Sequence, residues 1–578
     1  MLAIHQASFP AGDDDLGHGT PYSGRGRAFV EHIARLGFTG LMLGPAGLTS
    51  RDNPSPYDGT ALSRNPLHIA AGDLTRPEWG LLDPGAVAAA TAAVARSDSG
   101  RVSYRAAWDA QRALLDQAAA AARARADLTA RVAAFRAGAP WLAAEERYEA
   151  IAAAVGHDDW REWPPLDEAP RDDDAAARFA LAQLIVHAQH DAFRRHTGGL
   201  GLALYADLPI GLGHRDRLLY RHLFLDGYAM GAPPSRTNPD GQPWGYPVLD
   251  PDGAAGGPVR DFIALRVDKL LTEHDGLRID HPHGWVCPWV YRTDLADPLA
   301  AVQAGARLHE SPDLADHPAL AEHARVRPDQ IDRARPRHAD DWVRDLEPAQ
   351  IDRYATVFDL VVDAGRAHGV DPGDLVAEVL STCPRPLALV LARHHLGRFR
   401  VTQKARVDDP TDVYRGDRAA AEDWIMVGNH DTPPLRLVVE RWHGTDEAAR
   451  RAGYLAARLS PDDAERAALA RRLEADPGAM ASALVADLFV GPARNVQIFW
   501  VDLFGSRDVY NRPGVVAAEN WCLRVPADFE AAYAAAVAAG DAPDLGDALA
   551  RALHARGLDR DDEGRSLVAA LTDGRPQP

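Results

Sequence analysis

The chain has 578 residues, which exceeds the usual size of a single small domain and predicts a large catalytic fold or several domains. Its net charge of −20 argues against a nucleic-acid partner or an anionic membrane, and no apolar run reaches the roughly twenty residues of a membrane span. The cysteines Cys287, Cys383 and Cys522 have no disulfide-framework or metal-ligand spacing and no signal peptide is expected, so we predict a cytoplasmic protein without a bound metal.

Apolar runs and a helical segment alternate at the start of the chain. We expect a strand over 2–9, a helix over 27–36 and a second strand over 38–43, which together form a unit of a parallel α/β fold. The loop that follows is rich in proline and contains Tyr57. Its aromatic ring is a candidate platform for a sugar ring, and the alternative is a packed loop aromatic.

The composition changes between residues 83 and 198. Alanine and arginine dominate this stretch, and helices are expected over 102–135 and 175–194. We interpret the stretch as a helical insertion attached to the main fold, with the alternative that its helices simply cover one side of that fold. A C-terminal tail from about residue 527 is also rich in alanine and predicts helix, with a frayed end at 573–578.

Strands resume at 202–208, and that run contains Asp207 near its end. Residues 231–247 combine glycine, proline and aromatic side chains, which predicts a long loop rather than a linker. Trp244 lies in this loop, and aromatic faces beside polar groups suit the C–H faces of pyranose rings. Trp500, by contrast, is expected to pack in the last strand of the main fold.

Carboxylates end several of the later apolar runs. Asp280 follows 276–279, Glu378 follows 374–377, and Asp431 closes the run that begins at Trp424. Ligands bind at the carboxyl ends of parallel strands, so these acids are expected to converge. Arg278 shares a strand face with Asp280 and would keep it ionised, as a nucleophile requires, although a purely structural Arg–Asp pair is the alternative.

Three converging acids suit the cleavage of a glycosidic bond with retention of configuration. That reaction needs a carboxylate nucleophile and a second carboxyl that first protonates the leaving oxygen and then deprotonates the acceptor. A third carboxylate can hold substrate hydroxyls and favour an oxocarbenium-like state. His430 beside Asp431 adds a hydrogen-bond donor for those hydroxyls.

Several ordered blocks together resemble the 4-α-glucanotransferases (amylomaltases, disproportionating enzymes) of glycoside hydrolase family 77. The resemblance runs from Leu2 to about Arg524 and depends on the order of the blocks rather than on any single one. The blocks are His5 to Pro10, Ser55-Pro56-Tyr57 with Asn65-Pro66, the Trp160/Trp163 segment, Asp207-Leu208-Pro209, Gly231 to Pro247, Arg278 to His281, Ala377-Glu378, His430-Asp431 and Arg507 to Trp521.

The resemblance implies a (β/α)₈ TIM barrel with inserted, largely helical subdomains and no C-terminal β-sandwich. We expect the barrel to start in 1–82, the helical insertion to occupy 83–198, the rest of the catalytic barrel to occupy 199–526, and a helical tail to follow in 527–578. The implied reaction transfers a segment of an α-1,4-glucan to the 4-hydroxyl of another glucan or of glucose. No cofactor or metal is implied, and the oligomeric state is left open.

By position in the blocks, the resemblance assigns a role to each candidate residue. Asp280 matches the nucleophile, Glu378 the acid/base and Asp431 the stabiliser of the transition state. The matched substrate-binding residues are Tyr57, Trp244, Arg278, His430, Asp207 and Asn511.

Departures from the family pattern lie near these residues. Val379 stands where the family usually has an acid, Tyr246 where asparagine is common, and Arg215 near a usual acid. All three catalytic acids are present, so the reaction class is retained. Two alternatives remain: an α-1,4-glucan hydrolase of the same barrel type, and a non-catalytic glucan-binding paralogue.

Overall fold

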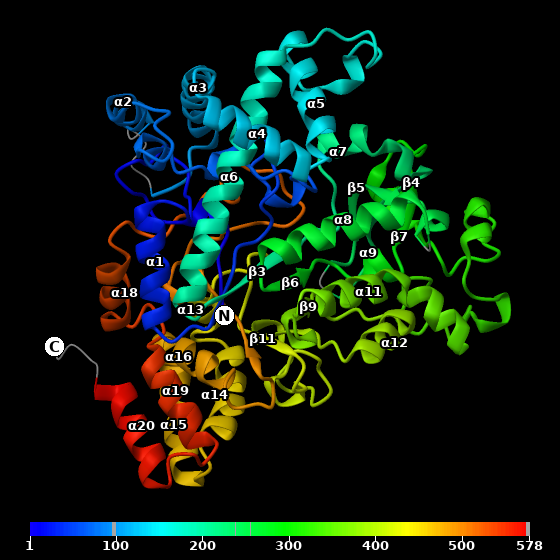
Figure 1. Ribbon diagram of the computed structural model, residues 1–578. Helices are drawn as coiled ribbons and strands as arrows, with labels where there is room; N and C mark the ends of the chain where they lie inside the picture. The colour runs from blue at the N-terminus through cyan, green and yellow to red at the C-terminus, as the bar shows by residue number, and fades with distance from the viewer. Residues whose placement is uncertain (95–99, 237, 255, 574–578) are drawn as a thin grey trace.

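In the computed structural model, residues 1–94, 100–236, 238–254 and 256–573 are described, and a ring of parallel strands lies at their centre (Figure 1). One arc of the ring has the order β13-β1-β2-β3-β6-β9, and a second has the order β10-β11-β12. The strands are β1 (Leu2–Ala3), β2 (Gly40–Met42), β3 (Ala203–Leu208), β6 (Gly276–Ile279), β9 (Leu375–Ala377), β10 (Phe399–Val401), β11 (Trp424–Met426), β12 (Asn495–Val496) and β13 (Ile498–Phe499).

The two arcs meet on both sides. On one side the Phe399 amide donates to the Val379 carbonyl (3.2 Å), and on the other β12 runs into β13 after a single residue. These strands are short and mostly buried along their length, as expected when helices cover a closed parallel sheet. The arrangement confirms the (β/α)₈ barrel predicted from the sequence.

The first strand is shorter than predicted. Only Leu2 and Ala3 pair in the barrel, and the chain then turns through a 3₁₀ segment, η1 (Gln6–Ser8), where a strand over 2–9 was expected. The predicted second strand and first helix are present as β2 and α1 (Gly24–Arg35). Because the strand ends at Ala3, His5 lies two residues beyond it, at the carboxyl edge of the barrel.

Helices cover the outside of the barrel. They include α8 (Pro258–Glu273), α11 (Pro348–Ala367), α12 (Arg385–His394) and α13 (Leu435–Trp442). Short helices occupy several loops: α7 (His214–Leu219), α9 (His283–Val286), α10 (Pro298–Gln303) and α17 (Trp500–Leu503). Trp500 is buried as expected, but it begins α17 instead of lying in the last strand.

The stretch 83–198 forms a helical layer at one end of the molecule, drawn in blue to cyan in Figure 1. Its helices are α2 (Pro84–Val94), α3 (Tyr104–Ala122), α4 (Ala126–Gly138), α5 (Leu142–Val155) and α6 (Asp173–Gly199). The single helix expected over 102–135 is wrong, because Arg125 adopts an extended backbone (φ −109°, ψ 98°) between α3 and α4. The alanine-rich sequence contains no proline or glycine there to mark the break.

A small antiparallel sheet lies beside the barrel mouth, with the order β5-β4-β7-β8. Its strands are β4 (Phe224–Ala232), β5 (Gln242–Leu249), β7 (Trp289–Arg292) and β8 (Ala306–Arg307). The loop predicted over 231–247 is therefore wrong at its two ends, where 231–232 belong to β4 and 242–247 to β5. Proline is tolerated because β5 is an edge strand, and positive φ angles at Gly241 (72°) and Gly245 (68°) allow the irregular hairpin.

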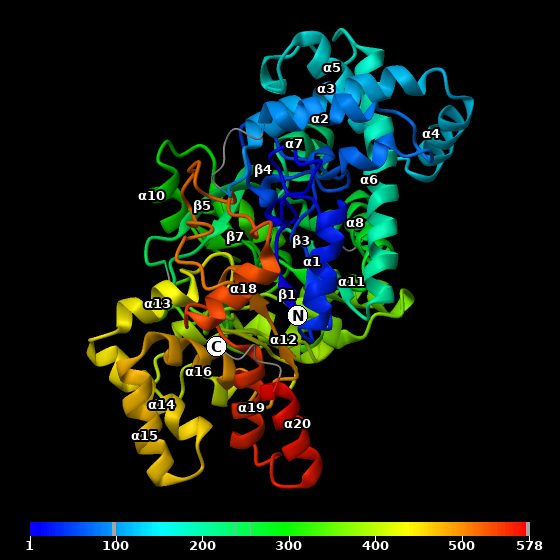
Figure 2. The ribbon, with the colours of Figure 1, turned by 90° about the vertical axis from the view of Figure 1, so that its left-hand side faces the viewer.

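The end of the described chain is helical and has no β-sandwich among its described residues. It comprises α14 (Asp446–Leu459), α15 (Asp463–Ala475), α16 (Pro477–Asp487), α18 (Phe529–Ala538), α19 (Leu545–Ala555) and α20 (Asp562–Asp573). Figure 2 places α14, α15, α19 and α20 at the end of the molecule opposite to α2–α5. The frayed end predicted for 573–578 lies almost wholly outside the described residues, and the domain boundaries stay a prediction.

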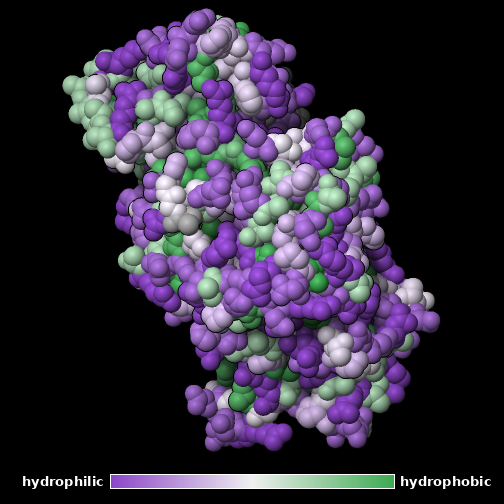
Figure 3. Space-filling view, turned by 90° about the vertical axis from the view of Figure 1, so that its right-hand side faces the viewer, coloured by the Kyte–Doolittle hydropathy of each residue, from purple (hydrophilic) through white to green (hydrophobic). Residues whose placement is uncertain are grey.

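The surface is mainly hydrophilic on the face that Figure 3 shows. Apolar side chains are scattered over it in small groups. Among the helices of the described ranges, none is both long enough and apolar enough to cross a membrane.

Candidate active site

Neighbouring barrel strands bring two of the predicted acids to the same edge. Ile279 of β6 pairs in register with Ala377 of β9. Asp280 directly follows β6, and Glu378 directly follows β9. On the other side of β6, Asp207 of β3 pairs with Arg278. The parallel register therefore brings three carboxylates and one guanidinium together at the carboxyl end of the barrel.

Arg278 is the centre of this group, and its side chain is only 3% exposed. Its Nη2 donates to Asp280 Oδ1 (3.1 Å) and, over a shorter distance, to Glu378 Oε2. Its Nη1 donates to Asp207 Oδ2 and to the Tyr57 hydroxyl (3.1 Å). One guanidinium thus holds three buried acids and the loop tyrosine, a geometry that the planar fork of arginine suits better than lysine would.

The acids respond differently to this shared charge. Burial acts to raise the pKa of Glu378, but the charge of Arg278 and its hydrogen bond outweigh burial and lower that pKa to about 2. Burial raises the pKa of Asp280 well above its usual value, opposed by Arg278 and reinforced by the charge of Glu378. Arg278 therefore acts to lower the pKa of Asp280, as predicted, but burial and the charge of Glu378 outweigh it in the unliganded site.

The third predicted acid is in a more open position. The side chain of Asp431 is 40% exposed, whereas that of Glu378 is 8% exposed. Asn511 donates from Nδ2 to Asp431 Oδ1 (2.7 Å), and His430 Nε2 lies 3.6 Å from Asp431 Oδ2. Asn511 therefore contacts the acid and fixes one of its oxygens, while the other is held only loosely.

Aromatic rings line one wall beside the acids. The Tyr57 ring stacks on the His430 ring with centroids 5.2 Å apart and planes 25° apart. Trp521 packs against both rings, at 5.6 Å from each. The Tyr57 hydroxyl donates to Asp207 Oδ2 (3.0 Å), so the ring is fixed from behind. A fixed, half-buried ring beside polar groups is the arrangement that a sugar face stacks on.

The antiparallel sheet supplies a second group of aromatic rings. Trp244 of β5 meets the His281 ring edge-on, with centroids 4.6 Å apart, and its Nε1 donates to Gln242 Oε1 (3.0 Å). His281 directly follows Asp280 and has a positive φ of 44°, which is uncommon for a residue other than glycine. The turn at His281 carries its ring from the barrel edge toward Trp244.

Two residues beside the acids were not among the predicted site residues. Burial lowers the pKa of His281 to about 4, while the negative charge of Glu378 acts in the opposite direction. Burial also lowers the pKa of Lys404, and the charges of Asp431 and Glu378 oppose that shift. Lys404 lies in a basic stretch, 398–406, which contains three arginines, and that composition is a sequence signal that could have indicated it.

The three departures from the family pattern differ in where they lie. Val379 is fully buried in the apolar core. Arg215 lies away from the acids, pairs with Glu149 of α5 and has its guanidinium 4.4 Å from the centre of the Tyr148 ring. Tyr246 lies at the site: its hydroxyl donates to Asp58 Oδ1 (3.3 Å), next to Tyr57 in the 3₁₀ turn η2 (Pro56–Asp58).

A cleft of about 680 Å³ opens beside the loop that follows Glu378. Polar side chains from four loops line much of it: Ser235, Arg236, His338, Asp340, Ser381, Thr382, Asp409, Thr411 and Asp412. The loop is tied to the catalytic edge because His283 hydrogen bonds with the Thr382 carbonyl (2.8 Å). The cleft thus lies on the same side as the predicted acid/base.

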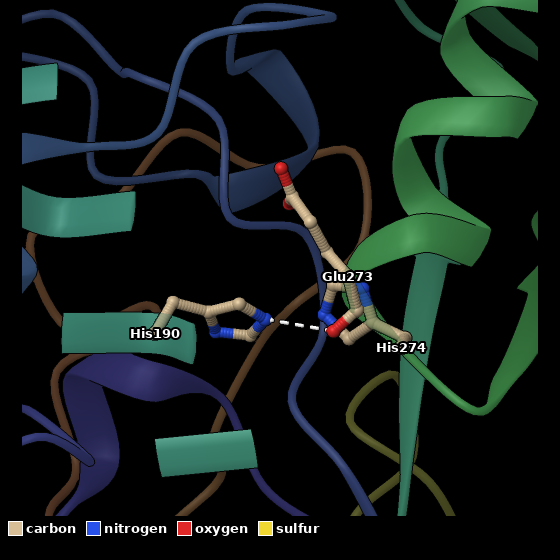
Figure 4. Close-up of side chains that lie close together, drawn as sticks. All are labelled: His190, Glu273 and His274. Carbon is tan, nitrogen blue, oxygen red and sulfur yellow. Dashed lines mark hydrogen bonds between the residues drawn. The ribbon is translucent and has the colours of Figure 1, made fainter. Parts of the chain in front are cut away.

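His190, Glu273 and His274 form the one group of potential metal ligands found within the described ranges (Figure 4). His190 Nε2 contacts the backbone carbonyl of Glu273 (3.0 Å), and the Glu273 carboxylate points away from both imidazoles. That carboxylate is paired with Arg64 (2.6 Å) and Lys269 (2.5 Å). Two cations already neutralise the one acid, so the group is a buried ion-pair cluster joining α6 to α8 and does not fit a metal ion.

Comparisons with known proteins agree with this geometry. A family model described as 4-alpha-glucanotransferase matches residues 5–529. Curated 4-alpha-glucanotransferases of Mycobacterium bovis and Mycobacterium tuberculosis are 29% identical over 168 residues, 26% of this chain. The chain spans only 22% of the length of these relatives.

Solved amylomaltases share the fold. The amylomaltase from Streptococcus agalactiae, solved in complex with acarbose, superposes with a TM-score of 0.70 at 16% identity, covering 99% of this chain and 98% of that one. The amylomaltase from Corynebacterium glutamicum gives 0.68 at 17% identity, covering 99% of this chain and 74% of that one. At these identities the likeness concerns the fold.

Proposed function

The chain belongs to the 4-alpha-glucanotransferase family, glycoside hydrolase family 77, and we propose that it transfers segments of α-1,4-glucan to the 4-hydroxyl of an acceptor glucan or glucose. The observation that carries the proposal is the convergence of Asp280, Glu378 and Asp431 on one barrel edge, with Arg278 between the first two. The aromatic rings beside these acids fit the faces of sugar rings.

The reaction follows a double displacement. Asp280 attacks the anomeric carbon while Glu378 gives a proton to the glycosidic oxygen, so that the C–O bond breaks and the leaving glucan departs with that proton. Glu378 then takes a proton from the 4-hydroxyl of the acceptor, whose oxygen attacks the anomeric carbon and releases Asp280. Asp431, fixed by Asn511, stabilises the positive charge that develops at the anomeric centre.

The unliganded protonation state must change before this reaction. Arg278 favours an ionised Glu378 and burial favours a protonated Asp280, whereas the first step needs the reverse. Both carboxyls contact Arg278 Nη2, and the charge of Glu378 acts on the pKa of Asp280, so a change at one carboxyl affects the other. We infer that a bound glucan draws Glu378 to the glycosidic oxygen, which leaves the guanidinium to stabilise the ionised Asp280.

The polar cleft beside the loop that follows Glu378 is the proposed acceptor side, because the acid/base must face both the leaving glucan and the incoming hydroxyl. Its hydroxyl and carboxylate lining suits sugar hydroxyls. Transfer exceeds hydrolysis when the acceptor fills this space and excludes water.

Hydrolysis is the second candidate function. The observation that favours it is the 40% exposure of the Asp431 side chain, which leaves the unliganded site open to water. Glycogen, starch or maltodextrin is the proposed class of substrate. The proposed location is the cytoplasm, on the basis of the three free cysteines Cys287, Cys383 and Cys522.

Incubation of the pure protein with maltotriose, with products resolved by chain length over time, tests the proposal. Glucose together with products longer than maltotriose is the expected result. Glucose and maltose alone would favour the hydrolase. No change with maltotriose or with longer maltodextrins would contradict both activities.

A further inference from the structure

A small cavity lies directly beneath the catalytic edge. Its volume is about 20 Å³, and its lining includes His5, Tyr57, Asp207, Arg278, His430 and Gln497. A cavity of this size holds a single water molecule when enough polar groups face it. Ala3 of β1 and Phe499 of β13 also line the cavity, so it lies between these strands and the arginine with its acids.

Polar atoms without a protein partner gather around this cavity. They are both imidazole nitrogens of His5, Oδ1 of Asp207 and Oε1 of Gln497. All three side chains are buried, at 6%, 3% and 3% exposure. An unpaired buried polar atom costs on the order of one hydrogen bond, and such atoms usually bond to ordered water when no protein group reaches them.

One water molecule can pair with three of these four atoms. Burial lowers the pKa of His5 well below its usual value, and the charges of His430 and Arg278 add to this, so the imidazole is neutral and has one N–H. Asp207 Oδ1 and Gln497 Oε1 are both acceptors. A water that accepts one hydrogen bond from His5 has two hydrogens left, one for each of these oxygens.

The chain keeps the His5 ring in place by two contacts. The ring stacks on Tyr510, with centroids 5.4 Å apart and planes 16° apart. On its other side is Gly44, which has a positive φ of 67°, and a Cβ there would lie 2.8 Å from His5 Nε2. A glycine at this position therefore leaves the space that the imidazole occupies.

We propose that His5 is a positioning residue of the catalytic site, which acts through one buried water to hold Asp207 and thereby Arg278. Asp207 already contacts Arg278 through Oδ2, so fixing Oδ1 as well leaves its carboxylate a single orientation. The guanidinium that Asp207 orients is the group shared by Asp280 and Glu378. The effect of His5 on activity rests on the proposed transfer reaction, whereas the water itself does not.

Two substitutions of His5 separate positioning from packing. His5→Phe retains a flat ring against Tyr510 but removes the N–H, and His5→Gln retains an N–H donor but loses the stacked ring. We expect His5→Phe to lower kcat for transfer from maltotriose about tenfold with KM changed by less than about twofold, and His5→Gln to regain most of kcat. A packing role predicts the opposite order, with His5→Phe the more active variant.

A crystal structure of the wild-type protein tests the water directly. The expected result is one ordered water within hydrogen-bond distance of His5, Asp207 Oδ1 and Gln497 Oε1. An empty cavity, or full activity in His5→Phe, would overturn the inference. If His5→Phe does not fold, Gln497→Met removes one of the two oxygens that accept from the water, and it is expected to lower kcat with KM unchanged. An unchanged kcat in Gln497→Met would also overturn the inference. A wild type inactive on glucans but with the water in place would refute the proposed function alone.

Discussion

Replacement of Arg278 by methionine tests whether this side chain is the electrostatic centre of the site. The substitution keeps much of the apolar stem and removes the guanidinium, which leaves Asp207, Asp280 and Glu378 buried without their shared cation. Removing one partner of a buried ion pair costs about 3–5 kcal/mol, because the remaining charge is uncompensated. We expect the Arg278→Met variant to be folded but markedly less stable at neutral pH.

The pKa of Glu378 gives an independent magnitude. Its folded value is about 2 against an ordinary value of 4.5, and at about 1.4 kcal/mol for each pKa unit this corresponds to about 3.5 kcal/mol of stability. The entropy of unfolding of 578 residues is about 1.2 kcal/mol/K near the melting temperature. A loss of about 3–5 kcal/mol should therefore lower the melting temperature by about 2.5–4 °C.

The loss of stability in the Arg278→Met variant should depend on pH. Because the folded pKa of Glu378 is depressed, its stabilising contribution is complete above the unfolded value of 4.5 and is lost as the pH falls toward about 2. In the variant the stranded acids have raised pKa values, and their cost is relieved as they protonate. The melting temperatures of wild type and variant should thus differ less near about pH 4 than near about pH 7.

Scanning calorimetry at both pH values measures this difference, and Arg278→Lys is the matched control. Lysine keeps the charge without the bidentate fork, so it should retain more stability than methionine while both variants lose transfer activity. A methionine variant as stable as wild type near neutral pH would refute the reasoning. The reasoning would also be refuted if the difference in melting temperature were equal or larger at the acidic pH.

Three further substitutions test other parts of the site. Asp280→Asn should lower the rate of transfer at least about a thousandfold and leave maltotriose binding intact. Its melting temperature should not fall, since a buried acid with a raised pKa costs stability at neutral pH. Unfolding of this variant would instead show that Asp280 is structural. Asn511→Ala should lower kcat/KM about ten- to a hundredfold by freeing Asp431, and unchanged kinetics would contradict that role. Arg215→Leu should lower the melting temperature by a few degrees through loss of the Glu149 pair, with KM for maltotriose unchanged; a changed KM at unchanged stability would place Arg215 in the substrate site.

The catalytic edge could be predicted from sequence because strand register determines it. Apolar runs that end in an acid, in a parallel barrel, leave their carboxylates at one edge, and Asp280 and Glu378 are at that edge. The opposite pKa shifts of Glu378 and Asp280 could not be predicted, since they depend on how the side chains of adjacent strands are placed around Arg278. The position of His5 beneath the site depends on contacts with residues hundreds of positions later, such as Tyr510.

The helical insertion and the β4–β5 hairpin were harder to predict from sequence for a different reason. The break at Arg125 follows from how α3 and α4 pack, and local propensity favours helix throughout that stretch. Similarly, Pro243 and Pro247 argue against a central strand but are compatible with β5, because it lies at the edge of its sheet. The position of a strand within its sheet is not encoded in the local sequence.

The departures from the family pattern can now be ranked by whether they can affect a substrate. Val379 packs in the apolar core and Arg215 joins α7 to α5, so neither side chain faces the acids. Tyr246 differs, because it contacts Asp58 beside Tyr57 and its ring is accommodated by Gly211, where a Cβ would lie 2.6 Å from that ring. A bulky phenol in place of an amide changes the space beside the aromatic wall without touching the catalytic acids. Differences in glucan preference should therefore arise at Tyr246, while the chemistry stays with Asp280 and Glu378.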